Sequence, residues 1–414
     1  MVILNQPFQG QLGDLLLQEL SKDYKTVTIF SAFAKNSGVL RLKKSLEHVK
    51  QAGGTIRAFI GCDLDGTSYE ALLNLFLICD ELYVIHSENA SATYHSKIYL
   101  LENKQKAWCA IGSNNLTGGG LWTNFESCAI QQFRLPEERA ELQNIYAVVE
   151  KYMDPQFSCS MKILSVTDLD LLLNGKYLFR EVEQKMNRLM HKTEHSKGQK
   201  KALFGTEKVK IPTLVGIEKG SDRRRREEAV EWSPLGGFTA EVDPGEPAPA
   251  FSNEQFWFEM RESTGGSRNI LDLSKLGRIM GGSVKGTAYE YKDPAWMYGG
   301  VKFFDIDPED TGREKNITIN YLGKDYYPST IKFASNNGSW RIQLKGEPSD
   351  GSGELSKFGS RGDFVHKILV FEKISEEYFV LSLLEETELN RLKKLSRVWA
   401  SNGSRVSSKA YGML

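Results

Sequence analysis

The sequence has no run of about 18 consecutive apolar residues, which is the length expected of a transmembrane helix. Its first residues, MVILNQPFQGQLGD, lack the basic segment and long apolar stretch of a secretory signal. Charge of one sign is not in excess either, because 53 basic side chains balance 53 acidic ones. We therefore expect a cytoplasmic protein that has no membrane partner.

Cysteine is scarce, and its distribution excludes two common roles. The five cysteines lie within the first 160 residues, their number is odd, and no two are spaced as CxxC. This pattern predicts reduced thiols and argues against a disulfide framework or a structural zinc site. We expect neither a metal nor a cofactor.

The net charge of zero conceals one strongly basic segment. Residues 185–226 carry 13 basic and 4 acidic side chains, including four consecutive arginines at 223–226. Residues 1–160 and 227–414 are both slightly acidic. The basic segment is either a solvated linker or an arm that binds a polyanion.

Residues 1–160 alternate between helical and strand periodicity. Apolar residues recur at helical spacing in 10–23, from 37 onward, in 68–80 and in 136–153. Runs rich in β-branched and aromatic residues separate these segments, as in YKTVTIFSAF and TIRAFIG. The alternation predicts an α/β sandwich, with a mixed sheet flanked by helices.

The remainder of the chain has a different pattern. Residues 161–235 are expected to form a basic, partly helical linker. From 236 to 390, short strand-like runs alternate with glycine-rich turns, which favours an all-β sandwich or barrel. Residues 391–414 are expected to finish a helix and end as a polar tail.

Polar side chains gather near the ends of three predicted strands of the first domain. His95 and Lys97 are separated by one residue, so on a strand they share a face, about 7 Å apart. Ser113 and Asn115 follow a second strand in the same way, and Glu126 begins a third. Neighbouring strands lie about 4.8 Å apart, so all five side chains are expected to converge.

This set of side chains suits attack on a phosphodiester. A neutral imidazole can attack phosphorus and form a phosphohistidine. The Lys97 ammonium, the Ser113 hydroxyl and the Asn115 amide can hold the phosphate oxygens. A carboxylate on the other imidazole nitrogen would fix the tautomer of His95, and Glu126 is the candidate.

The combination of HxK, GSxN and the later glutamate resembles the HKD motif of the phospholipase D superfamily. The upstream segments SAFAKNSGVLRL and FIGCDLDGTSYEAL also resemble the first strands of these nucleases, so the resemblance covers about residues 1–155. Two departures exist. Glu102 stands where the motif has aspartate, and the GSxN element follows three residues late, which a hairpin at 103–106 would absorb.

The family's active site combines two such motifs, but only His95 lies in an HxK that is followed by GSxN. The chain therefore resembles the single-motif members, which build the site by homodimerisation. With its second, β-rich module it is most similar to the NgoFVII-type phospholipase D-like type II restriction endonucleases. That resemblance implies a metal-independent endonuclease, a C-terminal B3-like pseudobarrel that reads double-stranded DNA, and a cognate methyltransferase.

Base reading would use arginine, lysine, asparagine or glutamine on arms between strands. The candidates are Arg261, Arg268, Asn269, Arg278, Lys302, Arg341, Gln343, Lys345, Arg361 and Lys367. Three tryptophans of the module are expected in its core: Trp257, Trp296 and Trp340.

Two other functions remain open. One is a lipid phosphodiesterase of the same superfamily. The other is a DNA-binding regulator that carries an inert HKD module.

Overall fold

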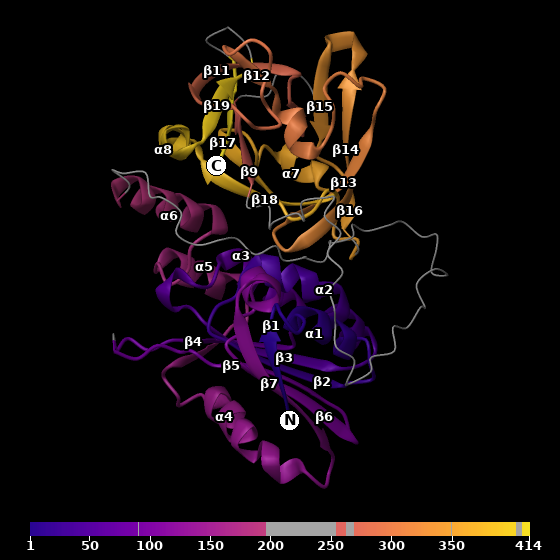
Figure 1. Ribbon diagram of the computed structural model, residues 1–414, viewed down its shortest axis with the longest axis vertical. Coiled ribbons are helices and arrows are strands. Elements are labelled where there is room, and N and C mark those ends of the chain that lie inside the picture. The colour runs from indigo at the N-terminus through magenta and orange to yellow at the C-terminus, as the bar shows by residue number, and fades with distance from the viewer. Residues whose placement is uncertain (90, 196–253, 262–268, 349, 403–407) are drawn as a thin grey trace. The chain divides into compact units, whose positions relative to one another are not determined.

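The structure, a computed structural model, describes residues 1–89, 91–195, 254–261, 269–348, 350–402 and 408–414. These residues belong to two compact units, which we describe separately (Figure 1). The first runs from Met1 to Lys185 and the second from Phe251 to Leu414, apart from segments around the basic region. The arginine run at 223–226 and most of the expected linker lie outside the described residues.

The first unit is built on an eight-stranded sheet in the order β1-β7-β6-β5-β2-β3-β4-β8. The strands β2, β3 and β4 are parallel and the other pairs are antiparallel, so the sheet is mixed, as predicted. Its strands are β1 (Val2–Gln6), β2 (Thr26–Ser31), β3 (Thr55–Gly61), β4 (Glu81–Ile85), β5 (Lys97–Glu102), β6 (Lys106–Gly112), β7 (Glu126–Arg134) and β8 (Ser160–Lys162).

Helices cover both faces of this sheet, which confirms the expected α/β layering (Figure 1). On one face the aromatic rings of Phe30, Phe59 and Tyr83 lie side by side on β2, β3 and β4, and Val149 of α4 packs against them. The other face carries α1, α2 and α3. The helices are α1 (Leu12–Leu20), α2 (Asn36–Gln51), α3 (Tyr69–Ile78), α4 (Gln143–Met153) and α5 (Val166–Asn174), and only the start of α6 (Glu181–His195) belongs to this unit.

Two edge strands of the sheet were not expected from the sequence. β1 pairs with β7, and the three-residue β8 pairs with β4. α5 then packs against α3, so the first unit continues past residue 160, where we expected the linker to begin. Strands as short as β8 carry too few residues to show a periodicity.

The second unit contains a twelve-stranded sheet whose main path runs β10-β15-β14-β13-β18-β17-β9-β20-β19-β11-β12, with β16 paired to β14. All pairs are antiparallel except β13 with β18. The strands are β9 (Gln255–Met260), β10 (Ile270–Asp272), β11 (Leu276–Gly282), β12 (Trp296–Tyr298), β13 (Lys315–Tyr321), β14 (Lys324–Ala334), β15 (Ser339–Gln343), β16 (Glu347–Pro348), β17 (Lys367–Lys373), β18 (Tyr378–Glu385), β19 (Val398–Ser401) and β20 (Ala410–Met413), with the short helices α7 (Ser356–Arg361) and α8 (Leu389–Leu395).

An aromatic-rich core packs against this sheet. Trp257 and Trp340 are fully buried, as expected, but Trp296 is only half-buried on β12. The expected tail is also structured, because β20 pairs with the central strand β9 and β19 pairs with β20. The described part of the second unit consists mainly of β-strands. Its likeness to a B3 pseudobarrel stays a prediction.

All five cysteines lie in the described part of the chain and are free thiols. In the same part, no helix is long and apolar enough to cross a membrane.

Candidate active site

Three neighbouring strands bring the HxK and GSxN segments together at one end of the first sheet. Lys97 is the first residue of β5, Gly112 the last of β6, and Glu126 the first of β7. Because the strands are ordered β7-β6-β5 and neighbours pair antiparallel, these three strand termini lie at the same end of the sheet. The antiparallel pairing of β5 with β6 and of β6 with β7 therefore explains why the HxK and GSxN segments lie close together.

His95 and Lys97 are in direct contact. The Lys97 Nζ atom lies 2.6 Å from His95 Nδ1 and also donates to the His95 carbonyl oxygen at 2.8 Å. The imidazole is exposed and meets the edge of the Phe33 ring, with ring centroids 5.7 Å apart. Lys97 thus contacts both the ring and the main chain of His95, while the histidine as a whole stays exposed.

Lys97 itself is largely withdrawn from water, with 6% of its surface exposed. Burial lowers the pKa of its ammonium group, and the negative charge of Glu126 opposes that shift only in part. A desolvated cation interacts more strongly with a bound anion than one in bulk water does. The site therefore holds a positive charge where an anionic group would enter.

Asn115 is held by the backbone just after β2. Its Oδ1 atom accepts a hydrogen bond from the Phe33 amide at 3.1 Å. The Ser31 hydroxyl links the same segments, because it donates to the Phe33 carbonyl and accepts from the Leu116 amide, both at 2.8 Å. With its oxygen anchored in this way, the amide nitrogen of Asn115 is left as a donor for a ligand.

Ser113 and Glu126 form a pair of their own. The Ser113 hydroxyl donates to Glu126 Oε2, and Asn124 Nδ2 donates to Glu126 Oε1 at 3.1 Å. Among the described residues, Glu126 therefore binds Ser113 and Asn124, and it does not bind the imidazole of His95 as we expected. The reason is geometric: β6 lies between β7 and β5, so Ser113 at the end of β6 is the nearer partner.

Two glycines let neighbouring backbone segments approach closely at this end of the sheet. A Cβ atom on Gly120 would lie 2.4 Å from the Asn115 carbonyl oxygen, and one on Gly112 would lie 2.3 Å from the Ser127 carbonyl oxygen. Neither position has room for a side chain. The glycines of GSNNLTGGG thus shape the loop that carries Asn115.

Glu102, which stands at the motif's aspartate position, is remote from this edge. It ends β5, and its carboxylate accepts a hydrogen bond from the Tyr146 hydroxyl. The predicted hairpin follows directly, with the Asn103 amide bonded to the Lys106 carbonyl at 2.9 Å. Glu102 has a structural role between the sheet and α4.

One neighbour of the site was given no role from the sequence. The Asp63 carboxylate accepts a hydrogen bond from the Tyr94 amide at 3.0 Å and contacts His86 Nδ1 at 2.6 Å. Tyr94 precedes His95, so Asp63 holds the backbone that carries the imidazole. No local signal predicts this contact, because 31 residues separate the two partners.

Several of the candidate DNA readers in the second unit are already engaged. Arg261 is ion-paired with Glu259 and Arg341 with Asp272, each at 2.7 Å. The other engaged candidates are Lys367 with Glu385, Arg361 with Asp363, Lys302 over the Tyr298 ring, and Asn269 with the Leu344 carbonyl. Contact with a phosphate or a base would have to replace these partners.

The candidates are also spread along the strand order, and Lys367 lies in its middle, on β17. Asn269, Arg341, Gln343 and Lys345 gather along β10 and β15, whereas Arg278 lies exposed on β11. Arg268 lies outside the described residues. A role in DNA binding stays a prediction for all of them.

In the part of the chain that the structure describes, no group of three or more histidine, cysteine, aspartate or glutamate side chains is arranged to hold a metal ion. Lys97 is the cation of the site.

The sequence matches no known family model, and no curated protein is significantly similar to it. Among solved structures, the chain is similar to the phospholipase D family member Nuc from Salmonella typhimurium, at 14% identity and a TM-score of 0.27, over 40% of this chain and 97% of that one. It is also similar to a phosphatidylserine synthase from Haemophilus influenzae Rd KW20, at 14% identity and a TM-score of 0.31, over 46% and 45% of the two chains. A polyphosphate kinase from Porphyromonas gingivalis follows, at 13% identity and a TM-score of 0.24, over 40% and 26%.

Proposed function

We propose that the protein is a metal-independent phosphodiesterase of the phospholipase D type that cleaves double-stranded DNA. The observation that carries this proposal is the contact of 2.6 Å between Lys97 Nζ and His95 Nδ1, beside the anchored amide of Asn115. A nucleophile, a desolvated cation and a neutral hydrogen-bond donor thus lie together at one end of the sheet. This is the set that in-line attack on a charged phosphodiester requires.

In the proposed reaction, His95 Nε2 attacks phosphorus and forms a P–N bond while a P–O bond to the leaving group breaks. The departing oxygen takes up a proton from an acid. Water then attacks the phosphohistidine and gives a proton to the conjugate base of that acid, the P–N bond breaks, and the imidazole is regenerated. Lys97, Asn115 and Ser113 stabilise the negative charge on the phosphate oxygens in both steps.

We also infer the tautomer of the resting site from the contact with Lys97. An ammonium that donates to Nδ1 leaves the proton of a neutral ring on Nε2, where no lone pair is available. We infer that a bound phosphate draws the ammonium away from Nδ1, so that the ring proton can move there. Nε2 would then become nucleophilic only when substrate is present.

One chain offers a single histidine of this kind, so we propose that a second copy supplies the acid. An apolar strip supports this arrangement, since Phe8 and Phe125 stack at 5.5 Å and are 70% and 65% exposed. Ile3 and Ile111, opposite the same residue Ala129, are a second exposed apolar pair, on β1 and β6, at 51% and 47% exposure. Phe125 adjoins Glu126, so a partner on this strip would lie next to the site.

We further propose that the second unit reads the DNA sequence as a B3-like module, and that the enzyme acts as a restriction endonuclease with a cognate methyltransferase. A phosphodiester is chemically the same in every sequence, so the first unit carries no base information. The gathering of Asn269, Arg341, Gln343 and Lys345 along one end of the sheet supports a reading surface there.

The deciding experiment combines cleavage with trapping of the intermediate. Wild-type protein should nick mixed-sequence plasmid DNA, and quenching in alkali during turnover should leave labelled phosphate on His95, because phosphohistidine survives alkali. His95→Ala should lose both signals and still bind DNA. Cleavage without label on the protein would remove the covalent mechanism.

The same preparations separate the alternatives. Hydrolysis of phosphatidylcholine vesicles without cleavage of any DNA would favour the lipid phosphodiesterase. Sequence-selective DNA binding by an inactive wild-type protein would favour the regulator.

Oligomeric state is tested with one surface variant. Phe125→Asp should shift the protein toward monomer in sedimentation velocity and lower activity in parallel. His48→Asp, on the exposed side of α2, is the matched control and should do neither. A monomeric wild type with full activity would contradict the dimer.

A further inference from the structure

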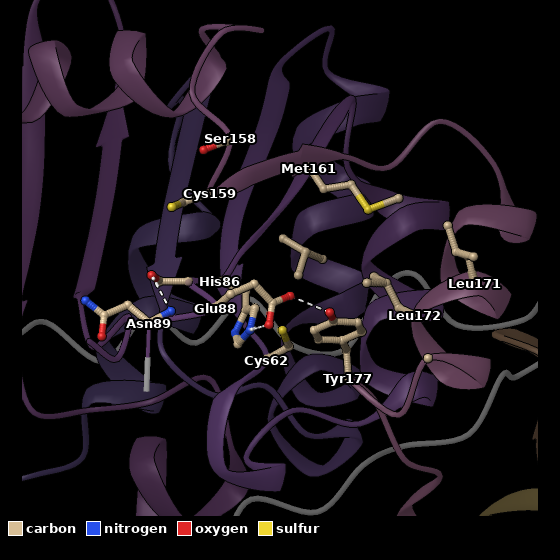
Figure 2. Close-up of a pocket in the computed structure, with 13 residues that line it drawn as sticks. Cys62, His86, Glu88, Asn89, Ser158, Cys159, Met161, Leu171, Leu172 and Tyr177 are labelled. Atoms are coloured by element: carbon tan, nitrogen blue, oxygen red, sulfur yellow. Dashed lines mark hydrogen bonds and ion pairs between the residues drawn. The ribbon is translucent and has the colours of Figure 1, made fainter. Parts of the chain in front are cut away.

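A pocket of about 680 Å³ opens in the first unit between β4, β8 and the end of α5. Cys62, His86 and Cys159, which adjoin the ends of β3, β4 and β8, line it on one side, and Leu172 and Tyr177 line it from α5 and the segment after it. Figure 2 shows the Glu88 carboxylate between His86 and Tyr177. His86, Glu88 and Tyr177 thus form a row of polar side chains in an otherwise largely apolar lining, and one member of the row also contacts Asp63, which binds the segment that leads to His95.

That member is His86. Its Nε2 atom lies 3.7 Å from Glu88 Oε2, and its Nδ1 atom lies 2.6 Å from Asp63 Oδ1. Glu88 in turn accepts a hydrogen bond from the Tyr177 hydroxyl. The imidazole is thus fixed on both sides, at 28% side-chain exposure.

Asp63 connects His86 to the segment that carries His95. Its side chain is only 9% exposed, and its second oxygen accepts the Tyr94 amide at 3.0 Å. The Tyr94 hydroxyl donates to the Phe59 carbonyl at 3.2 Å, so both ends of that residue are tied to β3 or the loop after it. His95 is the next residue, and it lies before β5 begins, without strand hydrogen bonds of its own.

We propose that His86 is a positioning residue, which acts through Asp63 to hold the backbone of Tyr94 and thereby the imidazole of His95. This inference deepens the proposed phosphodiesterase function and rests on it. A buried carboxylate that bridges two donors keeps a fixed orientation, whereas one that loses a donor can rotate. Misplacement of a reacting group by about 1 Å can cost about 100-fold in rate.

The test uses hydrolysis of bis(4-nitrophenyl) phosphate and three variants at the pair. His86→Leu removes the donor to Asp63 and should lower kcat about 10- to 100-fold with KM unchanged. His86→Asn should recover most of the lost kcat, because its Nδ2 is attached to Cγ as the histidine Nδ1 is. Asp63→Leu, which removes both contacts, should lose at least as much as His86→Leu.

A second readout does not depend on activity. Amide hydrogen exchange at Tyr94 should be about 10-fold faster or more in His86→Leu and Asp63→Leu than in the wild type and His86→Asn, because the exchange rate follows local opening. His48→Leu is the control histidine variant and should change neither readout. Circular dichroism establishes that each variant is folded.

The outcomes are distinct. An inactive wild type would remove the proposed function, and Tyr94 exchange alone would then decide whether His86 orders the segment. A His86→Leu protein with wild-type kcat and wild-type Tyr94 exchange would overturn the inference. A fall in kcat that His86→Asn does not recover would also overturn it, because the lost feature would then not be the donor at Nδ1.

Discussion

Lys97 Nζ contacts both Nδ1 and the carbonyl oxygen of His95, at 2.6 and 2.8 Å. This double contact is possible because Lys97 begins β5 while His95 lies just before the strand, where its carbonyl is free of the sheet. The lysine is thus both an anchor for the imidazole and the cation of the site. The consequences can be tested one residue at a time.

Replacement of the Lys97 cation should affect both rate and pH dependence. Lys97→Met should lower kcat about 10²- to 10³-fold, the usual loss for one group that stabilises transition-state charge. Since burial lowers the pKa of Lys97, the ammonium is lost at a lower pH than for an exposed lysine. The alkaline limb of the pH–rate profile should therefore lie below the ordinary lysine value, 10.5.

Lys97→Arg provides the matched comparison, because arginine stays charged through this range. Its residual activity should show no alkaline limb from this group. Identical alkaline limbs in wild type and Lys97→Arg would assign the limb to another residue.

Metal removal should leave DNA cleavage intact. In the proposed mechanism Lys97 supplies the positive charge that stabilises the phosphate, so excess EDTA should change the rate of plasmid nicking only through its effect on ionic strength. Cleavage that stops in EDTA and returns with Mg²⁺ alone would refute the proposed mechanism.

Gly120→Ala should displace the loop that carries Asn115. The new Cβ would lie 2.4 Å from the Asn115 carbonyl oxygen, so the loop has to move. We expect a loss of about 1–3 kcal/mol of stability, as for overpacking elsewhere, and a fall in activity from the displaced Asn115 amide. Gly312→Ala, where the nearest atom is 3.8 Å away, is the control for urea denaturation and should be nearly neutral.

The buried carboxyl group of Glu70, in the first turn of α3, should make stability depend on pH. Burial, and then the nearby Glu181, raise the pKa of Glu70 from 4.5 to about 7. The folded state therefore holds a proton that the unfolded state has released between these values, so stability should fall as pH rises from 4.5 to 7 and level off above. The fall should be on the order of 3 kcal/mol.

Glu70→Gln tests this prediction, because the amide mimics the protonated acid. The variant should lose the decline and be more stable than wild type at pH 8 in urea titrations. Glu137→Gln, an exposed carboxylate, should retain the wild-type profile. A Glu70→Gln profile parallel to wild type would show that Glu70 is ionised throughout.

Local sequence pattern determined much of the first unit. Helical spacing and β-branched runs predicted α1 to α4 and the six strands β2 to β7, because each of these segments is long enough to show its period. The same pattern placed His95, Lys97, Ser113, Asn115 and Glu126 near strand ends. Short or terminal segments such as β1, β8 and β20 could not be predicted, since only their partners make them strands.

Only the tertiary structure determined which side chains of the site are in contact. Glu126 binds Ser113 rather than His95 because β6 separates β7 from β5, and a strand order cannot be read from residue spacing. Likewise, Asp63 and His86 support Tyr94 only because β3 and β4 end beside the segment before β5. The sequence by itself specified which chemical groups lie at the ends of the strands. The pairing of the strands determined which of those groups face one another, because hydrogen-bond register and side-chain packing act between residues that are far apart in the chain.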